Sequence, residues 1–398
     1  MLPQTELSLE HILKHHELYL KSRRERGLSH KPFVVCISGC QGSGKTTLCN
    51  TLIHILRQAP YNLNVVGFSL DDLYLTRTDQ IELAKDNPGN RLLEHRGQAG
   101  SHDLNLGCTV FKQLLESEGE LVLIPTYNKL LHNGRGDRMD ESTWQKVYGP
   151  IDIVLFEGWS LGFKALPDKE LERIYQEKKD DEKVYFTRFA IEHLRKVNQY
   201  LTYYEQELYP FMDIFIHLSP EYLDQVYVWR LEQEHHAKEA SGMEGLSDQA
   251  VREFVDLYMP AYELYLPRLL EVGFFGQGPH GESLKDYEGW KRRDGGYSGA
   301  ERHMQMTLDR DRRVIRSKRI KEAVLESSFT SAAEEDNEGL GTHHWWAGHG
   351  GIIAGCAFIG ILGWMMFNRR QYWTQWNLTS LTTDKMTSYY KYIRRFNV

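Results

Sequence analysis

A glycine-rich motif at residues 39–46 constrains this chain more than any other feature. Its sequence, GCQGSGKT, matches the pattern G-x-x-x-x-G-K-[ST]. The apolar run 33–37 precedes it, and a segment with helical spacing of leucines follows it. A strand, this loop and a helix in that order form a phosphate loop, in which glycines at positive φ turn successive N–H groups toward an anion. The pattern predicts a nucleoside triphosphate site.

Each residue type in the motif has a chemical reason to be there. The N-terminus of the following helix adds partial positive charge at the anion. Lys45 can reach the β- and γ-phosphates, and the Thr46 hydroxyl can ligate Mg²⁺. The predicted phosphate-binding residues of the motif are Gly39, Cys40, Gln41, Gly42, Ser43, Gly44, Lys45 and Thr46. The predicted cofactors are therefore ATP and Mg²⁺.

Two acidic motifs follow apolar runs. The run 151–156 ends in Glu157, and the run 65–70 ends in Asp71 and Asp72. In a parallel sheet both ends face the phosphate loop, so Glu157 can hold Mg²⁺ through water and Asp71 can accept the proton of an attacking hydroxyl. The alternatives are that Glu157 only starts a turn and that one of the two aspartates caps a helix. Adjacent side chains point in opposite directions, so Asp71 and Asp72 cannot share one role.

The apolar runs also indicate the fold. Short runs at 33–37, 65–70, 121–124, 151–156 and 213–218 suit strands buried on both faces, and helical periodicity fills the intervals. This alternation predicts an α/β chain of the phosphate-loop NTPase class with a mostly parallel sheet flanked by helices. A helix over the first 25 residues and a last hairpin at 304–315 complete the expected kinase domain, residues 1–320. Within it, the glycines and charges of 275–300 predict a loop or disordered insert.

Composition excludes several classes of protein. The 398 residues carry a net charge of −7, which disfavours nucleic acid as a partner. Five cysteines at irregular spacing indicate neither a disulfide framework nor a zinc site. The N-terminus lacks the form of a signal peptide, so the expected location is the cytoplasm. A GTP switch is disfavoured because no N-K-x-D element is present.

The last 78 residues differ from the rest. We expect an acidic linker at 321–348, a membrane-span candidate at 349–367 and a basic tail at 368–398. Residues 350–367 carry no charge, but their glycines make them only weakly apolar, and the positive-inside rule would keep the basic tail in the cytosol. We predict a cytoplasmic protein in which the tail is dispensable for catalysis. The alternative is a protein anchored in a membrane through residues 349–367.

Six motifs in order resemble the D-glycerate 3-kinase family, in particular its fungal ATP-dependent branch, which is related to uridine and pantothenate kinases. They are CISGCQGSGKTTL (36–48), SLDDLYLT (69–76), RGQAGSHDL (96–104), PTYNKLLHNGRGDR (125–138), LFEGWSLGF (155–163) and WRLEQEH (229–235). The resemblance covers about residues 10–320. It implies ATP-dependent phosphorylation of a small hydroxyl compound.

The resemblance also implies roles for single residues. It adds Thr47 to the phosphate contacts, makes Asp71 the base, and associates Glu157 with Mg²⁺. It places the acceptor substrate against Arg96, His102, Asp103, Tyr127, Lys129 and Arg138. The alternative for the segment 96–103 is a surface Arg–Asp pair with a solvated histidine. Relatives read Y-D-K-S where this chain has Tyr127-Asn128-Lys129-Leu130, so an acid and a hydroxyl of the family pattern are replaced beside the predicted acceptor site.

Arg230 opens a helix that relatives use as a lid. A lid arginine would stabilise charge on the transferred phosphoryl group and help exclude water. The alternative is that the charges of this helix form a solvated face. The tyrosines at 258, 262 and 265 are predicted to belong to the core. The predicted function is transfer of the γ-phosphate of MgATP to a small molecule, D-glycerate first; the alternatives are another small hydroxyl metabolite or a non-catalytic, membrane-tethered nucleotide-binding protein.

Overall fold

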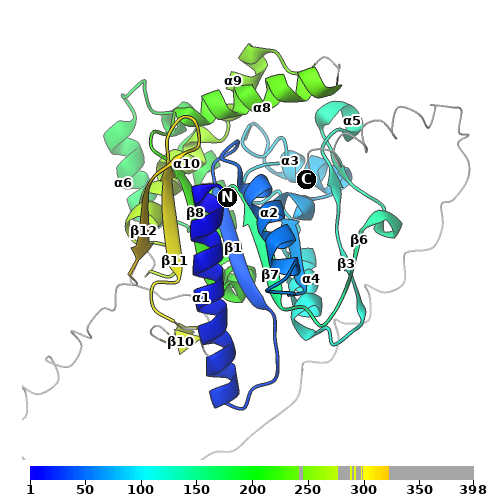
Figure 1. The fold of residues 1–398 in the computed structure, drawn as a ribbon. Coiled ribbons are helices and arrows are strands. Elements are labelled where there is room, and N and C mark those ends of the chain that lie inside the picture. The colour runs from blue at the N-terminus through cyan, green and yellow to red at the C-terminus, as the bar shows by residue number, and fades with distance from the viewer. Residues whose placement is uncertain (242–244, 277–286, 289–290, 293–296, 298, 322–398) are drawn as a thin grey trace, which may run out of the picture. The chain divides into compact units, whose positions relative to one another are not determined.

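A six-stranded sheet forms the centre of the protein. The structure, a computed structural model, describes residues 1–321 except 242–244, 277–286, 289–290, 293–296 and 298. The strand order is β12-β11-β8-β1-β7-β2, and all neighbours are parallel except the edge pair β11 and β12 (Figure 1). The strands are β1 (Phe33–Gly39), β2 (Val65–Ser69), β7 (Ile153–Gly158), β8 (Ile214–Pro220), β11 (His303–Leu308) and β12 (Val314–Ile320). The predicted mostly parallel sheet is confirmed.

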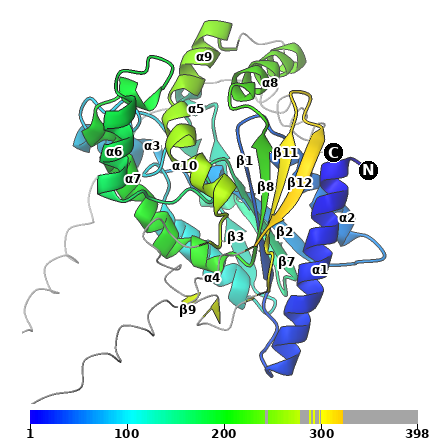
Figure 2. The ribbon, with the colours of Figure 1, turned by 90° about the vertical axis from the view of Figure 1, so that its left-hand side faces the viewer.

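Helices cover both faces of this sheet. Figure 2 shows α1 and α2 on one side and α4, α7 and α10 on the other. Every residue of β1, β7 and β8 is buried as a result, which is why their sequences are continuous apolar runs. The helices are α1 (Pro3–Glu25), α2 (Lys45–Arg57), α3 (Arg77–Asp86), α4 (Leu104–Glu116), α5 (Leu131–Gly134), α6 (Asp168–Lys178), α7 (Ile191–Glu207), α8 (Gln225–Ser241), α9 (Asp248–Asp256) and α10 (Met259–Glu271).

Strand register brings the predicted motifs to one edge of the sheet. Glu157 of β7 lies opposite Ile37 of β1 and opposite Ser69 of β2. Gly39, which opens the phosphate loop, lies opposite Leu218 of β8. The loops that follow β1, β2 and β7 therefore start side by side, although more than 100 residues separate the first from the last.

The expectation for residues 121–124 is wrong in one respect. They form a strand, β3 (Leu121–Ile124), but it pairs antiparallel with β6 (Gln145–Tyr148) outside the main sheet. Leu121 is 46% exposed, whereas Val122 and Ile124 are buried. Four consecutive apolar residues do not distinguish a strand buried on one face from one buried on both. A second ribbon pairs β4 (Tyr127–Asn128) with β5 (Asp137–Arg138).

Other predicted segments are found in part. The N-terminal helix is α1, with Ile12 fully buried, and the last hairpin is β11–β12. Within the expected insert 275–300, β9 (Tyr287–Glu288) pairs with β10 (Lys291–Arg292), and Tyr297 is buried. Residues 322–398 lie outside the described part of the chain, so the linker, span candidate and basic tail stay predictions. Among the residues described, no helix is long and apolar enough to cross a membrane.

Candidate active site

The phosphate loop connects β1 to α2 with two glycines at positive φ, +75° for Gly42 and +92° for Gly44. The backbone N–H of Ser43 and the Nζ of Lys45 both lie 3.2 Å from the Cys40 carbonyl oxygen. Both donors therefore face the interior of the loop, where an anion would lie. Lys45 is 9% exposed, so its charge acts in a largely desolvated place.

The predicted metal ligands meet at the end of the loop. The Thr46 hydroxyl donates to Glu157 Oε1 at 2.8 Å, and Glu157 is 8% exposed. Within the described residues, no group of three or more His, Cys, Asp or Glu side chains could hold a metal ion. Mg²⁺ does not require one, because it keeps several waters and takes oxygens from phosphates. A hydroxyl and a carboxylate at this distance fit it.

The two neighbouring aspartates of the short helix η1 (Leu70–Leu73) have different environments. Asp72 Oδ2 accepts from the Ser69 backbone N–H at 2.9 Å and so caps η1. Burial raises the pKa of Asp72 to about 7, and the charge of Asp71 adds to this. The Asp71 carboxylate instead forms an ion pair with Lys129. Asp72 therefore has a structural hydrogen bond to the backbone, whereas Asp71 is paired with the ammonium group of Lys129.

The ion pair keeps Asp71 ionised. Burial alone would raise the Asp71 pKa, but the Lys129 ammonium outweighs it, and the pKa falls to about 2. The positive charge of Lys45 lowers it further, so Asp71 lies close enough to the lysine of the phosphate loop to feel its charge. The ammonium group of Lys129 is partly desolvated, but the same pairing outweighs this and raises its pKa, while the side chain as a whole stays 54% exposed. An ionised carboxylate beside a nucleotide site can orient a hydroxyl and accept its proton.

Asp103 and Arg138 bond to each other and to backbone groups of the protein. Arg138 Nη2 donates to Asp103 Oδ2 at 3.1 Å and to the Tyr74 carbonyl at 2.9 Å. Asp103 Oδ1 caps α4 by accepting from the Leu106 N–H at 3.0 Å. The pair therefore ties the β4–β5 ribbon to the start of α4.

The side chains of Arg96 and His102 also have hydrogen-bond partners within the protein. Arg96 Nη1 donates to the Gly134 carbonyl at 2.8 Å, and its guanidinium lies over the Tyr127 ring. His102 is 5% exposed, so its interpretation as a solvated histidine is wrong. Its Nδ1 lies 2.7 Å from the Tyr204 hydroxyl, and burial lowers its pKa to about 4. His102 is therefore neutral near pH 7.

Arg230 does not reach the phosphate loop in this structure. It pairs with Glu234 of the same helix at 2.9 Å and lies 5.4 Å from the Phe254 ring centre. Its neighbour Trp229 packs on Gly42 instead. The tyrosines at 258, 262 and 265 are buried as predicted, and Tyr262 also donates its hydroxyl to Gln41 Oε1 at 2.7 Å.

Sequence reasoning also missed a charged contact of the loop. Arg312, in the turn between β11 and β12, donates from Nε to the Gly42 carbonyl at 2.6 Å. The two residues lie 270 positions apart, and no motif surrounds Arg312. No local signal could have identified it.

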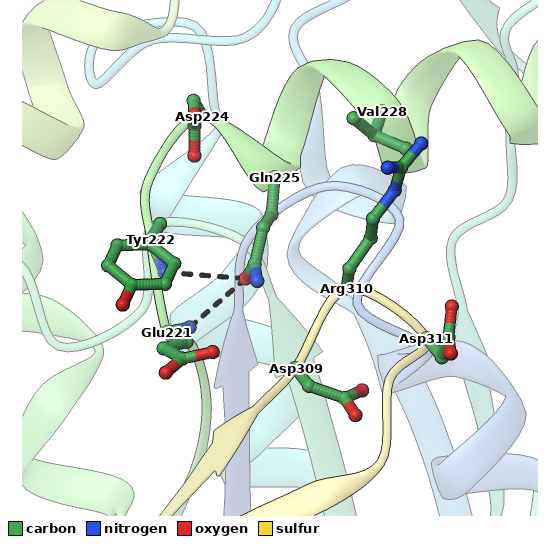
Figure 3. A pocket seen from close by; sticks show the side chains of 8 residues that line it. All are labelled: Glu221, Tyr222, Asp224, Gln225, Val228, Asp309, Arg310 and Asp311. Carbon is green, nitrogen blue, oxygen red and sulfur yellow. Dashed lines mark hydrogen bonds between the residues drawn. The ribbon is translucent and has the colours of Figure 1, made fainter.

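A pocket of about 440 Å³ opens beside this turn. Figure 3 shows its walls, which come from the β11–β12 turn and from the start of α8. Gln225 shapes one wall, because its side-chain oxygen accepts from the backbone N–H of Glu221 at 3.1 Å. The lining residues are Glu221, Tyr222, Asp224, Gln225, Val228, Asp309, Arg310 and Asp311.

Comparisons with known proteins give relatives of this chain in sequence and in structure. No family model matches the chain. The uncharacterized kinase mug58 of Schizosaccharomyces pombe is 42% identical over 242 residues, which are 60% of this chain and 83% of that protein. The structure of D-glycerate 3-kinase from Cryptococcus neoformans superposes with a TM-score of 0.66 at 30% identity, covering 79% of this chain and 99% of that one. The chain belongs to the D-glycerate 3-kinase family.

The family includes a plant protein, the chloroplastic D-glycerate 3-kinase of Arabidopsis thaliana, which is 40% identical over 250 residues. The match covers 62% of this chain and about half, 51%, of the plant protein. The predicted resemblance and the phosphate-loop NTPase fold are both confirmed. Membership of the D-glycerate 3-kinase family makes this chain an ATP-dependent small-molecule kinase.

Proposed function

We propose that this kinase transfers the γ-phosphate of ATP to the hydroxyl of a small hydroxy acid, with D-glycerate as the first candidate. In this step the acceptor oxygen forms a bond to the γ-phosphorus while the bond from that phosphorus to the β–γ bridging oxygen breaks. The hydroxyl proton passes to Asp71, and ADP leaves. Lys45 neutralises charge on the phosphates. The names of the plant and Cryptococcus relatives support the acceptor.

The different environments of Asp71 and Asp72 are the main support for the proposal. A protein that only binds a nucleotide needs no ionised carboxylate opposite the phosphate loop, because such a charge repels phosphates. Here the Asp72 carboxylate accepts a hydrogen bond from the Ser69 backbone N–H. The Asp71 carboxylate is kept ionised by its ion pair with Lys129. This arrangement favours a catalyst over the alternative of a non-catalytic nucleotide-binding protein.

Thr46 and Glu157 are the residues that would hold Mg²⁺. When bound, the ion neutralises charge on the β- and γ-phosphates. The 2.8 Å hydrogen bond between the two oxygens supports this assignment, because it brings both groups to one place. We place the nucleoside of ATP in the neighbouring pocket, because the turn that forms one of its walls also contacts the phosphate loop through Arg312.

Lys129 is the proposed contact for the carboxylate of the acceptor. Its side chain is 54% exposed while paired with Asp71, so a second anion can approach it. A hydroxy acid bound there would bring its hydroxyl next to Asp71. Arg96, His102, Asp103, Tyr127 and Arg138 then shape the surroundings through the contacts described above.

The test is to incubate the purified chain with MgATP and D-glycerate and to follow ADP release. A panel of other hydroxy acids, nucleosides and pantothenate identifies the acceptor. Lys45→Ala should weaken productive ATP binding, and Asp71→Asn should lower turnover by about 10²-fold or more with near-normal ATP binding. Asp72→Asn is the matched control, since Asn keeps an acceptor for the Ser69 N–H. Absence of acceptor-dependent ADP release across the panel would refute the kinase proposal.

A further inference from the structure

Gly42 is the point where helix α8 meets the phosphate loop. A Cβ atom built on Gly42 would lie 2.6 Å from the Cβ of Trp229 and 2.9 Å from its carbonyl carbon. These distances are too short for any side chain, and Gly42 also has φ +75°. The backbone of the loop is therefore in direct contact with that of α8.

Arg312 joins this contact from a third segment. Its Nε donates to the Gly42 carbonyl at 2.6 Å, and its Nη1 donates to Glu232 of α8 at 2.7 Å. Its guanidinium carbon lies 5.4 Å from the centre of the Trp229 ring. The Trp229 indole N–H completes the connection by donating to the Arg310 carbonyl at 2.7 Å. The loop, α8 and the β11–β12 turn are thus held together by one guanidinium group.

The contact with Gly42 has a consequence for the next amide. The carbonyl of Gly42 and the N–H of Ser43 belong to one planar peptide unit and point in opposite directions. Because Arg312 holds the carbonyl, the Ser43 N–H is directed to the Cys40 carbonyl, 3.2 Å away. Lys45 Nζ approaches the same carbonyl at 3.2 Å. The guanidinium therefore holds an amide donor toward the interior of the loop.

Arg312 lies in the short turn that joins β11 to β12. Its φ is +63°, in the left-handed region that residues other than glycine seldom adopt. The turn itself accounts for this conformation, because the Arg312 N–H donates to the Asp309 carbonyl at 3.0 Å, and it lets the side chain cross from the hairpin to the phosphate loop. A planar guanidinium can serve a carbonyl and a carboxylate at once, which an ammonium group cannot do with the same geometry.

We propose that Arg312 is a positioning residue for the nucleotide phosphates. It orients the peptide unit between Gly42 and Ser43 so that the Ser43 amide faces the phosphates, and it adds positive charge behind the loop. This inference rests on the proposed nucleotide site but not on the identity of the acceptor.

The experiment measures MgADP binding to the full chain by calorimetry and the KM values for ATP and acceptor by ADP release. Arg312→Gln should weaken MgADP binding about tenfold or more and raise the KM for ATP similarly, with the acceptor KM unchanged. The MgADP affinity of Arg312→Lys should lie between those of Arg312→Gln and the wild type, because lysine keeps the charge but not the planar group that donates in two directions at once. Glu232→Gln should have a smaller effect. Arg316→Gln, an exposed arginine of β12, is the matched control and should bind MgADP normally.

Several results would overturn the inference. The first is wild-type MgADP affinity in Arg312→Gln, including the case in which this variant only melts at a lower temperature. The second is a loss of MgADP affinity in Glu232→Gln as large as that in Arg312→Gln. If Arg312→Gln does not fold, Arg312→Lys decides, and unchanged affinity there counts against the role. MgADP binding is read without an acceptor, so a wild-type chain that binds MgADP but does not phosphorylate D-glycerate refutes only the proposed acceptor.

Discussion

The ion pair between Lys129 and Asp71 makes the proposed base independent of pH in the neutral range. Since the paired carboxyl has a pKa of about 2, its ionisation limits turnover only in strong acid. Lys129→Gln removes the cation while burial persists, so the Asp71 pKa should rise. We expect the acid limb of kcat at saturating acceptor to move upward by about one pH unit or more. Lys129→Arg keeps the charge and should leave the limb in place; identical profiles for Lys129→Gln and wild type would contradict the pairing.

Helix α4 depends on a residue that the family resemblance assigns to the acceptor. Asp103 caps the helix through Leu106 and holds Arg138 through its second oxygen. Asp103→Ala should lower the free energy of unfolding by about 1 kcal/mol or more, because a cap and an ion pair are lost together. Asp103→Asn keeps a capping oxygen and should cost less. Urea unfolding measures both, with the exposed Asn105→Ala as control. If Asp103→Asn raises the acceptor KM at unchanged stability, Asp103 also contacts the acceptor.

Packing of α1 against the sheet buries several histidines that no motif marks. His11 and His15 of α1 and His217 of β8 are at most 1% exposed. Burial lowers their pKa values, to about 3 for His11 and His217 and to about 4 for His15. The unfolded chain binds protons below pH 6.5, whereas the folded chain does not until the pH nears these lowered values. The contribution of these histidines to stability should therefore be constant above pH 6.5 and fall below it, by up to about 2 kcal/mol per histidine by pH 5. Asp72, whose pKa is raised, acts in the opposite direction and offsets part of this loss.

Urea unfolding between pH 7.5 and 5 measures this loss. His217→Gln should reduce its slope, and His54→Gln, at an exposed position of α2, should not. A free energy of unfolding that stays constant over this range would show that the histidines do not titrate as described.

Local sequence was sufficient for the phosphate loop, the alternation of strands and helices, and the carboxylates at the C-terminal ends of β2 and β7. Each depends on neighbours within about ten residues: glycine's access to positive φ, apolar runs, and the direction in which parallel strands end. The family resemblance added the acceptor segment. The placement of β3 outside the main sheet was not predictable in this way, because a four-residue run has the same composition in either position.

Tertiary structure alone decided which side chains meet. The ion pair that distinguishes Asp71 from Asp72 involves Lys129, 58 residues away, and the contact of Arg312 with Gly42 joins positions 270 residues apart. His102 was expected to be accessible and is buried because Tyr74 and Tyr204 pack on it. Such pairs have no fixed spacing along the chain. They exist only after the sheet order and the loop paths bring the segments together, and the pKa values and donor directions that govern the chemistry follow from those contacts.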